Sequence, residues 1–142
     1  MTLILVTNDD GIQSPGLWAA AGALLPLGRV VIAAPREQQT STGRSLPVSS
    51  DGRILAYPLE IAGQTLEAYS VGGTPAQAVL HAVLEILPER PDLVVSGINY
   101  GENVGSGVTI SGTVGAALEA GALGIPALAV SLQMLSENWY SY

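Results

Sequence analysis

Short apolar runs of strand length alternate with helical stretches along this chain, and this alternation constrains its fold more than any other feature. Four of the runs are continuous rather than alternating in polarity: TLILVTN (2–8), RVVIAAP (29–35), PDLVVSGIN (91–99) and IPALAVSL (125–132). Strands that are buried on both faces have this pattern, because helices cover both sides of a parallel sheet. The sequence therefore predicts an α/β fold built from parallel βαβ units.

Three segments carry the start and stop signals of helices. The first covers residues 14–28. The second begins at Thr74 and ends before Pro88, and the third, residues 111–124, has Ser111 at its cap. In the second helix, the spacing of apolar side chains predicts a buried stripe made of Val79, Leu80, Val83, Leu84 and Leu87.

The remaining segments are less regular. Residues 53–61 and 64–71 predict two further strands, arranged as a hairpin or as an excursion from the main sheet. Residues 36–52 are polar and rich in serine, threonine and glycine, which indicates a functional or mobile loop. Residues 100–110 predict a glycine-rich polar loop. We expect a single domain over residues 1–142.

Missing residue types exclude several chemistries. The chain has no cysteine and therefore no disulfide, thiolate nucleophile or thiolate zinc site. All five of its basic residues are arginines, so it has neither a Walker A lysine nor a Schiff base. His81 is the single histidine and cannot form a multi-histidine metal site. Carboxylates, hydroxyls and amides remain, and they favour a hard cation such as Mg²⁺, Mn²⁺ or Ca²⁺.

The charge balance bears on partners and location. A formal charge of -7 without a basic stripe disfavours binding to a nucleic acid polymer or to an anionic membrane. No apolar run has the length of a membrane span, and the first residues lack the basic region and cleavage site of a signal peptide. We therefore expect a cytoplasmic protein.

Polar side chains follow the predicted core strands at the point where each strand ends. In an open parallel α/β sheet, ligands bind outside these carboxyl ends. We therefore expect one shared rim. Its candidate residues are Asn8, Asp9 and Asp10 after the first strand, the TSTG loop (40–43) after the second, Asn99 after the third and Ser131 after the fourth.

The adjacent carboxylates Asp9 and Asp10 indicate a metal site. Two like charges side by side repel each other unless a cation or strong donors offset the repulsion. A divalent cation would neutralise them, and Asn99 with a hydroxyl from Thr40 or Ser41 would complete its oxygen shell. The alternative is a turn in which the NDDG side chains only cap the backbone.

The start of the third predicted helix adds chemistry suited to anions. Ser111, Gly112 and Thr113 would offer free backbone N–H groups, positive partial charge and two hydroxyls. An ordinary capped helix is the alternative. Beside a carboxylate-bound cation, however, this helix start would form a phosphate-binding site of the kind that a phosphate monoester requires.

Five motifs together resemble the SurE family, the survival-protein-E nucleotidases and phosphatases. In chain order they are LVTNDDGIQSPG, APREQQTSTGRS, GGTPAQAV, PDLVVSGINYGENVG and SGTVGAALEA. The resemblance implies a Rossmann-like three-layer α/β sandwich with a mostly parallel central sheet. It also implies Mg²⁺- or Mn²⁺-dependent removal of phosphate from nucleoside monophosphates, broad acid phosphatase activity, and a homodimer or homotetramer.

The resemblance assigns roles to individual residues. Asp9 and Asp10 match the metal-binding aspartates of the family, and Asn99 matches its metal-binding asparagine. The metal-binding serine of the family aligns with Thr40, so either Thr40 or the neighbouring Ser41 would supply the hydroxyl. The residues that match the surroundings of the phosphate are Asn8, Ser111, Gly112 and Thr113.

Departures from the family pattern keep a second hypothesis open. Ile110 stands where the family usually has a histidine, Gln77 replaces a common acidic residue, and we expect the C-terminal oligomerisation region of the family to be absent.

The leading hypothesis is a metal-dependent 5'/3'-nucleotidase in which Asp9 or Asp10 orients or deprotonates the attacking water. The alternative is a catalytically weak module that binds metal or nucleotide or only assembles. A dinucleotide oxidoreductase is disfavoured, because NDDGIQ is not G-x-G-x-x-G.

Overall fold

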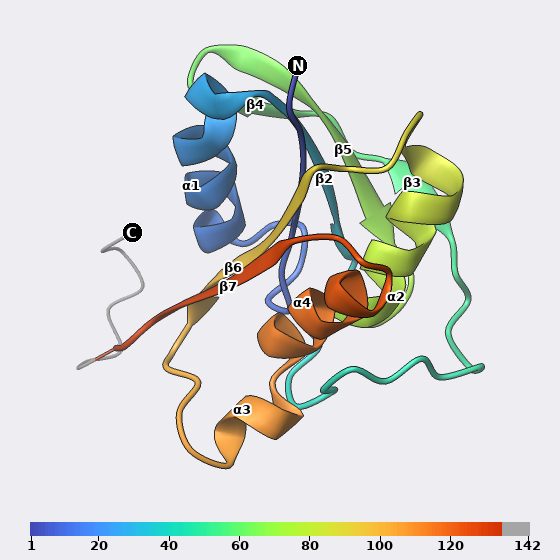
Figure 1. The fold of residues 1–142 in the computed structure, drawn as a ribbon, viewed down its shortest axis with the longest axis vertical. Coiled ribbons are helices and arrows are strands. Elements are labelled where there is room, and N and C mark those ends of the chain that lie inside the picture. The colour runs from blue at the N-terminus through green and yellow to red at the C-terminus, as the bar shows by residue number, and fades with distance from the viewer. Residues whose placement is uncertain (135–142) are drawn as a thin grey trace.

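A computed structural model describes residues 1–134, which build one mostly parallel sheet with helices on both faces (Figure 1). The strands are β1 Leu3–Thr7, β2 Arg29–Pro35, β3 Ile54–Ala56, β4 Leu59–Ile61, β5 Gln64–Val71, β6 Leu93–Tyr100 and β7 Ala127–Leu132. The α-helices are α1 Pro15–Leu24, α2 Pro75–His81, α3 Gly107–Ile110 and α4 Gly112–Ala122. A 3₁₀ turn, η1 (Leu25–Leu27), and a π-helical turn, η2 (Ala82–Ile86), follow α1 and α2. This architecture confirms the predicted Rossmann-like α/β sandwich.

The strand order places the carboxyl end of β1 at the centre of the sheet. The order is β3-β5-β2-β1-β6-β7, and β1 pairs in parallel with both β2 and β6. From β1 the chain builds outward through β2 to β5, and it then crosses back to form β6 and β7 on the other side. Ligands bind at such a reversal of strand order in open α/β sheets. The residues that follow β1 and β6 therefore lie at the favoured position for a site.

Alternating side chains of the central strands pack against different helices. Ile4 and Val6 of β1 belong to the apolar cluster that includes Leu17 of α1. Leu5 of β1 packs in the opposite cluster, together with Val79 of α2 and residues of α4. Figure 1 shows α1 on one face of the sheet and α2 with α4 on the other. This two-sided burial is the reason that the core strands read as continuous apolar runs.

Residues 53–71 confirm the expected hairpin, which belongs to the main sheet rather than forming an excursion from it. The run 53–61 forms two short strands, β3 and β4, which are separated at Tyr57 and Pro58. Proline has no N–H to donate to a strand ladder, so it interrupts this one. Both short strands pair antiparallel with β5, and β5 itself pairs in parallel with β2. β5 is therefore part of the main sheet.

The second helix confirms its predicted start but not its whole apolar stripe. Thr74 and Gln77 form a capping box: the Gln77 N–H donates to the Thr74 hydroxyl at 3.2 Å, and the Thr74 N–H donates to Gln77 Oε1 at 3.0 Å. Helix α2 then gives way to the wider turn η2, which rotates the following side chains. Leu84 is consequently 68% exposed, and the stripe prediction was wrong for this residue. The buried residues of α2 and η2 are Pro75, Ala76, Ala78, Val79 and Ala82.

Two smaller expectations also changed. Residues 100–110, predicted as a loop, contain the one-turn helix α3. Ser14 stands at the N-cap of α1, as expected, but its side chain makes no capping hydrogen bond. Within residues 1–134, no helix combines the length and the apolar character needed to cross a membrane.

Candidate active site

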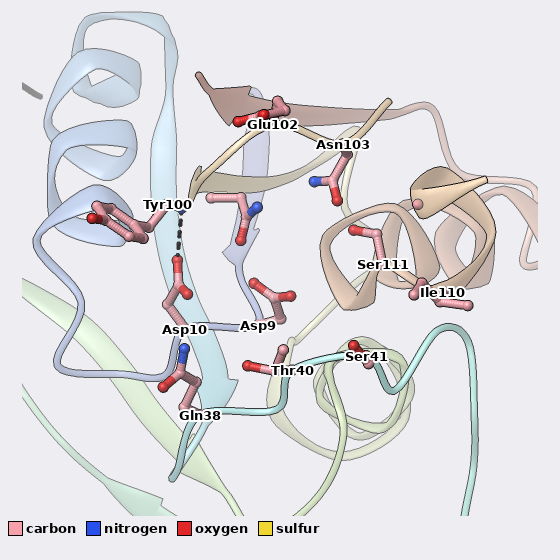
Figure 2. A pocket seen from close by; sticks show the side chains of 12 residues that line it. Asp9, Asp10, Gln38, Thr40, Ser41, Tyr100, Glu102, Asn103, Ile110 and Ser111 are labelled. Carbon is pink, nitrogen blue, oxygen red and sulfur yellow. Dashed lines mark hydrogen bonds between the residues drawn. The ribbon is translucent and has the colours of Figure 1, made fainter. Parts of the chain in front are cut away.

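A pocket of about 290 Å³ opens at the carboxyl ends of β1, β2 and β6 (Figure 2). This volume is near the lower end of the range of about 300–1,000 Å³ that small-molecule sites occupy. Segments that are far apart in sequence supply its walls. Six of the residues singled out in the sequence line it: Asp9, Asp10, Thr40, Ser41, Asn99 and Ser111.

The other three predicted phosphate-site residues lie behind the pocket wall rather than on it. Asn8 is fully buried, and both ends of its amide bond the backbone of Gly11, at 2.9 Å and 3.2 Å. The Thr113 hydroxyl donates to Asp9 Oδ1 at 3.1 Å. At Gly112, an added Cβ would lie 2.8 Å from the Cβ of Asp9, so the start of α4 approaches Asp9 only because this residue has no side chain. All three residues therefore position Asp9.

Ser131, expected on the rim, does not line the pocket. Its hydroxyl accepts a hydrogen bond from Nδ2 of Asn103 at 2.6 Å. Ser131 pairs with Asn99 across β6 and β7, where the register shifts between Ser96 and Asn99. This irregularity adds one residue to β6, and such bulges re-aim side chains next to active sites.

The two carboxylates are partly desolvated. Asp9 is only 7% exposed, and burial, together with the neighbouring Asp10 charge, raises its pKa to about 6 against the opposing hydrogen bond from Thr113. Burial also raises the pKa of Asp10, although the Tyr100 backbone N–H, 3.0 Å from Asp10 Oδ2, and the Gln38 side chain oppose this effect. No arginine lines this pocket. A cation would therefore relieve an electrostatic cost that the described residues leave uncompensated.

The oxygen donors around the pair suit a hard divalent cation. Asn99 donates through Nδ2 to the carbonyl of Gly101 at 2.8 Å, which leaves its Oδ1 available to the pocket. The hydroxyls of Thr40 and Ser41 are both exposed on the facing loop. Among residues 1–134, no three His, Cys, Asp or Glu side chains gather as a metal-binding group. A cation here would thus combine two carboxylates with neutral oxygens and water, as Mg²⁺ commonly does.

The loop 36–52 is tied to the sheet and to α4 close to the pocket. The Gln39 N–H donates to the carbonyl of Asp9 at 2.7 Å, and the Gly43 N–H donates to the carbonyl of Ile110 at 2.9 Å. Arg44 forms an ion pair of 2.7 Å with Glu119 of α4, whose side chain is 6% exposed. These contacts flank Thr40 and Ser41 on both sides. The loop therefore holds the hydroxyls of Thr40 and Ser41 in fixed positions beside the pocket.

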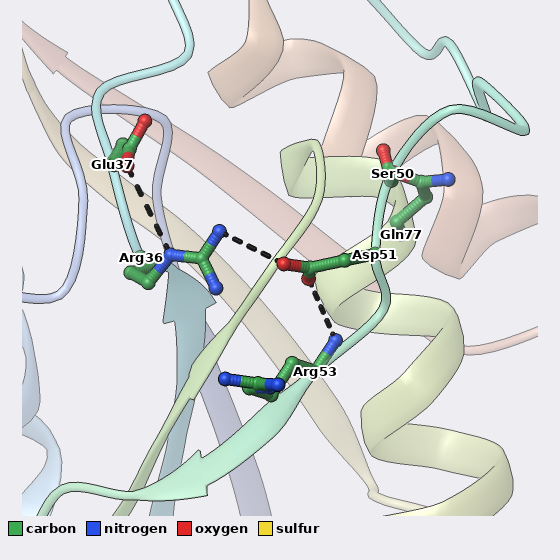
Figure 3. A network of polar contacts seen from close by, with 6 residues as sticks. All are labelled: Arg36, Glu37, Ser50, Asp51, Arg53 and Gln77. Atoms are coloured by element: carbon green, nitrogen blue, oxygen red, sulfur yellow. Dashed lines mark hydrogen bonds and ion pairs between the residues drawn. The ribbon is translucent and has the colours of Figure 1, made fainter.

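The far half of the loop is held by α2 and by an arginine network. Figure 3 shows Arg36 paired with Asp51 at 3.2 Å, while the Arg53 N–H donates to the same carboxylate at 2.9 Å. These contacts, the Arg53 N–H foremost, hold the pKa of Asp51 below its usual value. On α2, the Gln77 amide accepts from the Ser50 hydroxyl at 2.7 Å and donates to the carbonyl of Pro47 at 2.8 Å.

We predict that Gln77→Glu loosens this anchorage at neutral pH. A carboxylate keeps the acceptor for Ser50 but places a second oxygen against the carbonyl of Pro47, which loses its donor. The expected destabilisation is about 1–3 kcal/mol at pH 7. It should shrink at low pH, where a protonated carboxyl donates again. Chemical denaturation at both pH values measures this effect, with the exposed Gln64→Glu as a control. Equal stability of both variants at pH 7 would contradict the anchoring role.

The candidate site residues make up half of the pocket lining. Ile110 was noted only as a departure from the family pattern, and the residues that the sequence did not indicate are Gln38, Tyr100, Glu102, Asn103 and Gly107. Tyr100 ends β6, and the others lie in the two loops or in the short helix α3, where no periodicity marks an inward-facing side chain. The polar sequence GEN, directly after Asn99 and Tyr100, is the one signal that could have indicated Glu102 and Asn103. Ile110 is 54% exposed at the pocket wall.

Comparisons with known proteins identify relatives of this chain. The family model described as "Survival protein SurE" matches residues 4–141. A protein named "5'-nucleotidase SurE" from Methanopyrus kandleri is 52% identical over 131 residues, covering 92% of this chain and 49% of the relative. Its namesake from Methanosarcina barkeri is 49% identical over 136 residues, covering 95% of this chain and 49% of that protein.

A solved structure agrees with these sequence relatives. The crystal structure of the Sure protein from Aquifex aeolicus matches with a TM-score of 0.79 and 39% identity, covering 95% of this chain and 52% of that one. The chain thus spans about half the length of the relatives that it matches.

Proposed function

This chain belongs to the SurE family, and we propose that its pocket is the centre of a metal-dependent phosphomonoesterase that acts on nucleoside monophosphates, a 5'/3'-nucleotidase. The observation that carries the proposal is the pair of adjacent carboxylates, buried Asp9 and half-buried Asp10, which shares a pocket with neutral oxygen ligands and lies beside the start of α4. Names of relatives support the same substrate class.

The proposed mechanism assigns each group a role. Asp9, Asp10 and Asn99, with a hydroxyl of Thr40 or Ser41, would hold Mg²⁺ or Mn²⁺, which supplies Lewis-acid polarisation of a phosphoryl oxygen when bound. Asp9 or Asp10 orients the attacking water or accepts its proton.

At the other side of the pocket, the start of α4 stabilises the charge that develops on the phosphoryl oxygens. The Ser111 hydroxyl accepts from the Val114 N–H at 3.2 Å, which leaves its own hydrogen free to donate to a phosphate oxygen. The positive end of the helix acts in the same direction. Asn8, Gly112 and Thr113 contribute by holding Asp9 and the helix start in place.

Two observations favour the alternative, a catalytically weak module that binds metal or nucleotide. The chain spans about half the length of the relatives that it matches. Ile110, an apolar side chain, also lines the pocket where a proton donor would assist the leaving group. Metal and phosphate binding without turnover is the behaviour expected of such a module.

Phosphate release from 5'-AMP and 3'-AMP, with Mg²⁺ or Mn²⁺ and with EDTA, tests the proposal. We expect release that requires metal and that Asp10→Asn abolishes. Asp92→Asn is the matched control, because Asp92 is exposed, lies away from the pocket and only accepts from the Leu3 N–H. Release that persists in EDTA would contradict the metal dependence. Metal binding without release would support the alternative.

Assembly and location complete the proposal. We propose a homodimer or homotetramer, as the family resemblance implies, and a cytoplasmic location. Light scattering on the eluting protein should give two or four times the mass of one chain. The mass of a single chain would contradict the proposed assembly.

A further inference from the structure

A second pocket adjoins the first and has no role in the chemistry described above. It has a volume of about 160 Å³, and its own walls are Gln13, Ser14 and Pro15, at the start of α1. Asp10 and Gln38 line both pockets, so the two share one wall. The side pocket therefore extends from the carboxylate pair towards the N-terminus of α1.

Ser14 places in this pocket a hydroxyl that is unpaired among the described residues. It is 8% exposed, and it lines the side pocket. An N-cap serine ordinarily accepts a hydrogen bond from a backbone N–H in the first helical turn. Here only the backbone carbonyl of Ser14 accepts, from the N–H groups of Leu17 and Trp18, and within residues 1–134 its hydroxyl makes no hydrogen bond. The Ser14 hydroxyl is therefore open to the side pocket, where it can donate to a ligand group or accept from one.

The lining suits an uncharged polar group rather than a second phosphate. Its polar groups are the amides of Gln13 and Gln38 and the Ser14 hydroxyl, and no arginine lines it. The negative charge of Asp10 on the shared wall repels anions. Gln13 donates through Nε2 to the Tyr57 hydroxyl at 3.2 Å, which orients the amide and leaves its Oε1 as an acceptor.

We propose that the side pocket binds one hydrogen-bonding ring, the sugar or the base, of the nucleoside whose phosphate lies in the main pocket. This inference rests on the proposed function and deepens it. The main pocket alone is near the lower limit for small-molecule sites, so an ester with a large alcohol needs the additional volume. Ser14 donates to the ring or accepts from it, and Gln13 accepts through Oε1.

The test uses adenosine, which carries no phosphate and does not require the metal. Amide spectra of the ¹⁵N-labelled chain are recorded in EDTA while adenosine, ribose or adenine is added. We expect shifts at Gln13, Ser14 and Gln38 with adenosine, and with whichever of ribose and adenine supplies the bound ring. Shifts confined to other residues, or none at millimolar adenosine, would overturn the subsite.

Two serine variants sharpen this test. Ser14→Ala should weaken adenosine binding about 3- to 10-fold, as expected for one lost hydrogen bond. Its melting temperature should stay unchanged, because this side chain caps nothing. Ser45→Ala, in the loop and away from both pockets, should leave the affinity as it is. An unchanged affinity in Ser14→Ala would overturn the role of Ser14.

Turnover separates this inference from the proposed function. In an active chain, Ser14→Ala should raise KM for 5'-AMP and leave KM for methyl phosphate unchanged, and an equal rise for both would overturn the subsite. Adenosine binding at the side pocket without metal-dependent phosphate release would support the subsite and contradict the phosphomonoesterase alone. Metal-dependent phosphate release without adenosine binding would support the phosphomonoesterase and overturn the subsite.

Discussion

Asp9→Asn should stabilise the metal-free protein at pH 7 and at the same time abolish metal-dependent phosphate release. The pKa of Asp9 is raised from 3.8 to about 6 in the folded protein. Between these two values the folded state binds more protons than the unfolded state, so stability falls as the pH rises. At pH 7 the ionised carboxylate therefore costs up to about 3 kcal/mol, because each unit of pKa corresponds to about 1.4 kcal/mol.

The difference in stability between Asp9→Asn and the wild type should depend on pH. In EDTA, the protonated Asp9 side chain of the wild type adds to the free energy of unfolding. This stabilisation is fully present below pH 3.8 and is lost as the pH rises through about 6. Asparagine has the same shape, accepts from Thr113 and carries no charge. The stability of Asp9→Asn should thus exceed that of the wild type near pH 7 and approach it near pH 4. Urea denaturation at both pH values measures the difference, with Asp92→Asn as the control.

Metal reverses the order of stability. Mn²⁺ should stabilise the wild type in proportion to its binding and leave Asp9→Asn almost unaffected, because the variant lacks one of the two carboxylates. The rate of phosphate release should fall at least about 100-fold, since even outer-shell metal partners are worth 10–100-fold. A variant that is less stable than the wild type in EDTA, or that retains activity, would contradict the assigned role of Asp9.

Gly115→Ala should destabilise the protein although it replaces a glycine inside a helix. Such a replacement ordinarily stabilises by about 1 kcal/mol. Here the added Cβ would overlap the carbonyl group of Gly43 and lie 2.7 Å from the backbone nitrogen of Arg44. The loop 36–52 must move away from α4, at a cost of about 1–3 kcal/mol. Metal affinity should fall as well, because Thr40 and Ser41 belong to the displaced loop.

Gly121→Ala is the matched control in the same helix. Apart from its chain neighbours and the backbone of its own helix, no atom of the described residues lies within 4 Å of the added Cβ, so the substitution should stabilise the protein by up to about 1 kcal/mol and leave metal binding unchanged. Thermal denaturation and calorimetric titration with Mn²⁺ measure both effects. Equal stabilisation by the two substitutions would show that the loop does not rest on α4 as described.

The core strands could be predicted from the sequence because their burial on both faces leaves a continuous apolar signal. The order of the strands could not. β5 reads locally as a strand, but it pairs with β2 in a register that joins Val31 to Glu67, and no local pattern encodes that pairing. Leu84 shows a second limit: the stripe assumed regular α-helical spacing, and the wider turn η2 shifts the register after His81.

The candidate site was predictable where it depends on strand ends. Asp9, Asp10 and Asn99 follow β1 or end β6, so parallel pairing brings them together. Asn8 and Thr113 were expected around the phosphate, yet both lie behind the wall and bond other residues. Only three-dimensional contacts reveal this difference, because the sequence shows which polar residues lie near a rim but not which way each one faces.

The most direct test of the metal site is the paramagnetic broadening of amide signals by Mn²⁺. Substoichiometric Mn²⁺ should remove the signals of Asp9, Asp10, Asn99 and the TSTG loop (40–43) first, while signals at the start of β5, near Gln64, should persist. Asp9→Asn should restore the lost signals. Broadening that begins elsewhere, or signals at Asp9 and Asp10 that survive saturating Mn²⁺, would contradict a metal centre in this pocket.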